Sequence, residues 1–101
     1  MSDLRAELTD SIDQATWEWL IPHSERDAVI LVALGLDLVE VGMAIVNDNT
    51  NSVQHWIAEG LLYKPSPQQK ADWNLNQTKR FKALIVQPYV LIQEAEFLAG
   101  E

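Results

Sequence analysis

The sequence contains no cysteine, which excludes disulfide bridges, thiolate zinc sites and thiol nucleophiles. Its four glycines are scattered at positions 35, 42, 60 and 100, so there is no glycine-rich phosphate loop. No apolar run approaches the roughly 20 residues of a membrane span, and residues 1–13 lack the basic and apolar regions of a signal peptide. We therefore expect a cytoplasmic protein with no membrane association, no bound metal and no cofactor.

Basic residues are also scarce, because seven lysines and arginines stand against 15 acids, for a formal net charge of −8. Residues 1–27 carry −5, residues 37–64 carry −3 and residues 65–101 are neutral. Nonspecific nucleic-acid binding depends on cationic side chains that displace condensed counterions, so the charge makes nucleic acid an unfavourable partner. A chain of 101 residues, 48% of them apolar, suits one domain covering residues 1–101.

The hydrophobic pattern predicts an α+β fold with a small, mainly antiparallel sheet. The β-branched run at 28–34 predicts a central strand buried on both faces. Residues 81–92 are strand-like throughout, and Pro88 within them marks an edge, a bulge or a break between two strands, because proline cannot donate a ladder hydrogen bond. Residues 38–46 fit both a strand and a helix, and we favour the helix because Asp37 can cap it.

Helices are predicted both before and after the central strand at 28–34 in the sequence. One covers about 3–12 with Ser2 as its cap, and a short aromatic helix follows Asp13 and ends before Pro22, since proline disfavours helical geometry in the residue before it. Two middle helices, at about 51–59 and 67–75, are expected to pack on one face of the sheet.

The helix at 51–59 is predicted from a clear apolar stripe. Val53, Trp56 and Ile57 recur at helical spacing and are expected to enter the core, with Thr50 or Asn51 as the cap. Gly60 stands where a left-handed residue ends a helix.

Residues 37–62 have the outline of a helix-turn-helix, but their second helix contains no lysine or arginine to contact phosphates or bases. Packing of the helix pair against the core is the favoured interpretation. The alternative is a nucleic-acid-associated regulator whose cationic contacts would be Lys64, Lys79, Arg80 and Lys82.

Four tryptophans are a large aromatic content for so short a chain. Trp17 and Trp19 are two positions apart, so they cannot both face inward on one helix, and an exposed tryptophan is typical of protein interfaces. A long apolar strand marked by proline could also pair with another chain. The predicted contact surface therefore comprises Trp17, Trp19, Pro88 and Tyr89.

A cluster of polar residues beside the predicted central strand suggests a third possibility, a small-ligand pocket. Its residues would be His23, Arg26, Asp27 and Glu40. No catalytic residues are identified there, because adjacent turn residues do not give the convergent geometry of a catalytic triad.

Four blocks of sequence together resemble a family of small bacterial proteins, frequent in cyanobacteria and catalogued as a domain of unknown function. They are WEWLIPHSERDAVILV, LDLVEVGMAIVNDN, VQHWIAEGLLYKPS and RFKALIVQPYVLIQ. The resemblance covers about residues 4–93 and implies a stand-alone cytoplasmic protein of about this length, with no activity, ligand or catalytic residue to transfer. The sequence therefore favours a non-enzymatic protein-interaction module that forms a homodimer or binds another protein.

Overall fold

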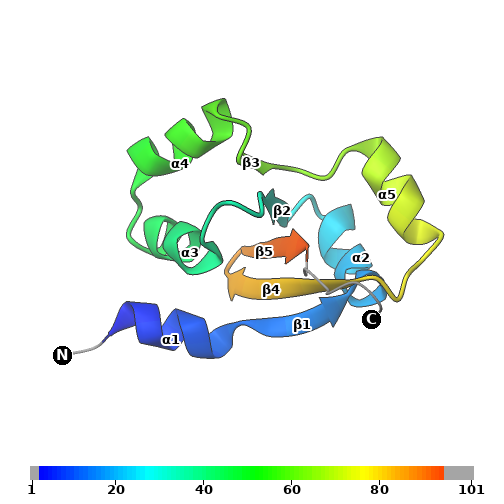
Figure 1. Cartoon of the computed structure of the whole chain (residues 1–101), viewed down its shortest axis with the longest axis horizontal. Helices are drawn as coiled ribbons and strands as arrows, with labels where there is room; N and C mark the ends of the chain where they lie inside the picture. The colour runs from blue at the N-terminus through cyan, green and yellow to red at the C-terminus, as the bar shows by residue number, and fades with distance from the viewer. Residues whose placement is uncertain (1–2, 95–101) are drawn as a thin grey trace.

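The computed structural model describes residues 3–94, and within them helices and strands are interspersed in an α+β arrangement (Figure 1). The helices are α1 (Leu4–Ser11), α2 (Trp17–Glu25), α3 (Leu38–Val46), α4 (Thr50–Ala58) and α5 (Pro67–Asn74). The strands are β1 (Asp13–Thr16), β2 (Val29–Val32), β3 (Leu62–Tyr63), β4 (Arg80–Val86) and β5 (Tyr89–Glu94). The predicted fold class is confirmed, and residues 38–46 form the helix that the Asp37 cap favoured.

The strands form one sheet in the order β1-β4-β5-β2-β3. All neighbouring strands are antiparallel except β2 and β5, which run parallel with Val29 opposite Val90. Strands β4 and β5 form a hairpin whose turn contains the cis peptide bond between Gln87 and Pro88. Pro88 therefore marks a break between two strands. The predicted buried strand is confirmed as β2, which is an interior strand between β5 and β3, while β5 is at the centre of the sheet.

Helices cover both faces of the sheet, because alternate strand residues point in opposite directions. On one face, here called the α3 face, Leu84 and Leu91 pack with residues of α1 and α3. On the other, the α2 face, Phe81 and Ile92 pack with residues of α2 and α5. The expectation that the middle helices share one face is wrong for α5, because its Trp73 belongs to the α2-face cluster.

Several predicted boundaries near the N-terminus are wrong. Asp13 begins β1 rather than capping a helix, and α2 starts four residues later. Helix α2 also continues through Pro22, because its buried residues Trp17, Leu20 and Ser24 lie on one helical face whose burial favours the helix beyond the proline. The predicted cap, Ser2, lies outside the described residues, and the cap of α1 is Asp3, whose side chain accepts from the backbone N–H of Ala6.

The pair α3–α4 has the predicted outline but a less buried second helix. Asp48 (φ 58°) turns the chain between the helices, and the Asn49 side chain accepts from the backbone N–H of Ser52 at 3.3 Å, so Asn49 and not Thr50 or Asn51 is the cap. Val53 and Trp56 pack partly buried on the α3-face cluster. Ile57 is 56% exposed, so its predicted place in the core is wrong.

Candidate protein-interaction surface

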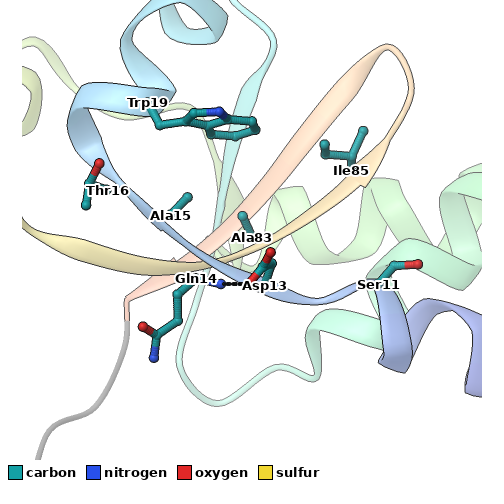
Figure 2. A pocket seen from close by; sticks show the side chains of 8 residues that line it. All are labelled: Ser11, Asp13, Gln14, Ala15, Thr16, Trp19, Ala83 and Ile85. Atoms are coloured by element: carbon teal, nitrogen blue, oxygen red, sulfur yellow. Dashed lines mark hydrogen bonds between the residues drawn. The ribbon is translucent and has the colours of Figure 1, made fainter.

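Part of the α2 face is left uncovered beside the edge strand β1, and a hollow of about 470 Å³ lies there (Figure 2). We call it the Trp19 hollow. It is lined by Ser11, Asp13, Gln14, Ala15, Thr16, Trp19, Ala83 and Ile85.

Two alanines set the depth of this hollow. Ala15 in β1 and Ala83 in β4 are on the α2 face, where their small side chains leave space beneath the indole of Trp19 (Figure 2). Ile85, two residues further along β4, is 50% exposed although its cross-strand partner Val90 is buried. The sheet therefore presents an apolar strip that the described helices leave partly uncovered, most of all at Ile85.

The two tryptophans of α2 have opposite environments. Trp17 is 1% exposed, and its indole N–H donates to Oδ1 of Asn74 at 2.8 Å while its ring packs edge-on against Trp73 at 5.0 Å. Its burial removes Trp17 from the predicted contact surface. Trp19 is 47% exposed, and its ring is supported by the imidazole of His23 at a centroid distance of 4.8 Å.

The rim of the hollow is polar and includes the carboxylate of Asp13. Oδ1 of Asp13 accepts a hydrogen bond from the backbone N–H of Gln14 at 2.8 Å. The hydroxyl of Ser11 donates to the carbonyl of Glu7 at 2.9 Å, so its oxygen lone pairs are available to a donor. The rim thus offers oxygen acceptors and one negative charge, while the floor is apolar.

The hydrogen bond between Gln14 and Asp13 also closes part of the free edge of the sheet. The backbone N–H of Trp17 donates to the carbonyl of Lys79 in the chain leading into β4, at 2.9 Å. In an antiparallel ladder, successive residues alternate between facing the partner strand and facing away. Gln14 therefore faces the open edge, where its N–H is already satisfied by a side chain.

The remaining members of the predicted contact surface lie elsewhere. Pro88 is exposed in the hairpin turn, and Tyr89 is 38% exposed beside Ala44 and Ile45 on the α3 face. Because Trp19 is on the α2 face, Trp19 and Tyr89 do not form one surface.

The predicted polar pocket is not assembled as one site. His23 and Arg26 are joined by a hydrogen bond of 2.9 Å between Nδ1 and Nη2, and Asp27 pairs with Lys64 at 2.7 Å. The hydrogen bond and charge of Lys64 lower the pKa of Asp27 below its ordinary value. Glu40 is in the first turn of α3 and lines a separate hollow with Arg5 and Met43.

The four cations of the nucleic-acid alternative do not converge on α4. Lys64 follows β3, whereas Lys79 precedes β4 and the other two are among its first three residues. Strands β5 and β2 separate β4 from β3. Lys79 is paired with Glu94 at 3.1 Å, Arg80 is also engaged, and Lys82 is exposed. Among residues 3–94 no group of three metal-ligating side chains is found either.

The comparison with protein families decides the identity of this fold. The model described as "Protein of unknown function (DUF2288)" matches residues 3–94, which is nearly the whole chain. The chain belongs to the DUF2288 family. This confirms the resemblance to a bacterial domain of unknown function.

A solved structure supports the DUF2288 fold. The solution NMR structure of PA1075 from Pseudomonas aeruginosa is 33% identical to this chain, with a TM-score of 0.79 over 96% of this chain and 89% of that one. The comparison with curated proteins finds no match. Within residues 3–94 of this DUF2288 chain, no helix has the length and hydrophobicity to cross a membrane.

Proposed function

We propose that this chain is a non-enzymatic protein-interaction module whose Trp19 hollow binds a lysine or arginine side chain on an apolar, extended segment of a partner protein. The observation that carries the proposal is the placement of two half-exposed apolar side chains, Trp19 and Ile85, beside the carboxylate of Asp13. Residues 1–27, which supply most of the lining, carry a net charge of −5.

The chemistry of the lining fits a cation with an apolar stem. A tryptophan face attracts an ammonium or guanidinium group by about 0.5–1 kcal/mol at an exposed site. The methylene groups of lysine and arginine bury well along apolar surface while the charged head stays near water. The floor of Ala15, Ala83 and Ile85 suits such a stem, and Asp13 and the hydroxyls of Ser11 and Thr16 suit its head.

Recognition through side chains fits this site better than addition of a strand to β1. A strand added to the sheet would need the outward N–H and C=O groups of β1. The N–H of Gln14 is occupied by Asp13, and β1 is only four residues long. The partner is therefore expected to lie on the α2 face rather than extend the sheet.

The proposal is tested by NMR titration with a capped peptide of alternating lysine and valine. We expect chemical-shift changes at the Trp19 indole N–H and at amides of residues 13–16 and 83–85, and a dissociation constant that increases with salt as the charge attraction is screened. A capped peptide of alternating glutamate and valine should leave these signals unchanged. Spermidine has the amines but not the apolar, extended segment that carries them in the peptide, so it should bind more weakly.

Three variants separate the contributions of Trp19, Ile85 and Asp13 to peptide binding. Trp19→Ala and Ile85→Ser should each weaken binding, and Asp13→Asn should weaken it by removing the charge while the amide oxygen still accepts from Gln14. Glu59→Gln removes the same charge at the exposed end of α4 and serves as the matched control. Equal effects of Asp13→Asn and Glu59→Gln would show that only the overall charge matters and would contradict the proposed site.

A further inference from the structure

A second apolar surface lies on the α3 face, alongside α4. Two hollows of about 260 and 250 Å³ adjoin there and share Ile45 and Val53 in their walls. We call them together the α4 groove. The first hollow is also lined by Ala44, Asp48, Asn49, Thr50, Gln54 and Tyr89. The second is also lined by Ile30, Ile57, Leu62, Tyr63 and Lys64.

Helix α4 is weakly covered by the rest of the described chain. None of its nine residues is buried. Helices shorter than about 12 residues are marginal in water and depend on tertiary packing of an apolar face. Ile57, which lines the groove, is 56% exposed. Apolar surface of α4 thus remains available for a second contact.

The charge of the groove indicates what can cover it. The chain carries −8 overall, which makes most of its surface repel another copy. Helix α4, in contrast, contains no aspartate, glutamate, lysine or arginine. The groove lining has one acid, Asp48, by the start of α4 and one base, Lys64, beyond its end, and Lys64 also pairs with Asp27, so the groove carries little net charge.

A two-fold axis would also place these charges favourably. In an interface between identical patches, each end of one copy meets the opposite end of the other. An axis near Ile45 and Val53, the residues that both hollows share, would bring Asp48 of one copy towards Lys64 of its partner. Lys64 already binds Asp27 at 2.7 Å, and its ammonium group has further donors.

We propose that the α4 groove is the contact surface of a homodimer, with Ile57 of each copy inserted into the groove of the other. Ile57 is the protrusion and the hollow at the Asp48 end of the groove is the recess. A two-fold axis near Ile45 and Val53 brings Ile57 of one copy to that hollow of the other, as a self-complementary interface requires. This inference does not depend on the Trp19 hollow, which lies on the opposite face of the sheet.

Sedimentation velocity from low micromolar to millimolar concentration tests the dimer. The 11.4 kDa chain should sediment as a monomer–dimer equilibrium. Ile57→Glu should raise the dimer dissociation constant by roughly ten- to a hundredfold, because the interface loses a buried isoleucine and gains a charge. Ile85→Glu is the matched control, since Ile85 is 50% exposed on the α2 face, and should leave the dimer unchanged.

Spin labels locate the dimer interface without relying on the Ile57→Glu substitution, which could itself affect folding. The chain has no cysteine, so Asn51→Cys on exposed α4 and Gln68→Cys on exposed α5 each give a single label. The distance between two Asn51 labels in the dimer should be shorter than that between two Gln68 labels. A monomer at millimolar concentration, equal effects of Ile57→Glu and Ile85→Glu, or the reverse order of distances would overturn the proposal. A monomer that binds an amphipathic helical peptide through the groove would overturn it too.

Discussion

Gly42 allows α3 to pack directly against the sheet. A Cβ at this position would lie 2.7 Å from Cδ2 of Leu84 and 3.3 Å from Cδ1 of Leu8. Leu84 is fully buried in the α3-face cluster, so its methyl group has little space into which it can move. Close helix–sheet contact therefore depends on the absence of a side chain at this position.

We expect Gly42→Ala to destabilise the fold by about 1 kcal/mol, because overpacking costs about 1–3 kcal/mol and the better helix propensity of alanine returns about 1 kcal/mol. Urea denaturation monitored by circular dichroism measures the change. Gly35→Ala, where a Cβ would meet nothing within 4 Å, is the control and should be close to neutral. If Leu84→Val does not reduce the cost of Gly42→Ala, the clash with Leu84 is not its cause.

The two tryptophans of α2 show how much of a residue's burial can be predicted from the sequence. Their spacing of two predicts that they cannot share one helical face, and this is confirmed. It does not tell which one is buried, because that depends on Trp73 and Phe81, which pack against Trp17 from distant parts of the chain. The depth of the Trp19 hollow was also not predictable, since the small size of Ala15 and Ala83 matters only once β1 pairs with β4.

A strand or helix is predictable from the sequence where its own side chains have a clear hydrophobic pattern. The run at 28–34 predicts β2 because β-branched residues there are buried on both faces. Strand β1, with the sequence DQAT, has no apolar alternation and was missed, because its pairing with β4 holds it in place. The helix predicted at about 67–75 is confirmed as α5, but its single buried residue, Trp73, does not indicate which face it covers.

Strand β1 is the element where edge protection can be tested. Asp13 satisfies the outward N–H of Gln14, and edge strands with free backbone groups pair with other chains. Asp13→Ala should expose this N–H and increase intermolecular β-structure on prolonged incubation, as detected by thioflavin T fluorescence and infrared spectroscopy. Asp13→Asn, which retains the acceptor, should behave much more like the natural chain despite losing the same charge. If both variants aggregate equally, charge rather than the hydrogen bond protects the edge.

At the scale of the whole molecule, the two proposed surfaces lie on opposite faces of one sheet and differ in charge. The Trp19 hollow belongs to the most acidic part of the chain, which suits a cationic partner and disfavours a second copy. The α4 groove is neutral and more apolar, which suits a second copy. The family model covers both surfaces but assigns a role to neither, because their properties arise from side-chain placement rather than from the fold.

This separation predicts how binding and dimerisation combine. A dimer formed through the α4 groove leaves both Trp19 hollows open, so we expect one lysine–valine peptide per chain in monomer and dimer alike. Isothermal titration calorimetry should give the same dissociation constant for the natural chain and for Ile57→Glu, once the heat of dimer dissociation is subtracted. Ile85→Ser should weaken the peptide binding and leave sedimentation unchanged. One peptide per dimer, or peptide binding that dissociates the dimer, would place the two functions on a shared surface and contradict this arrangement, because opposite faces of a covered sheet do not compete for space.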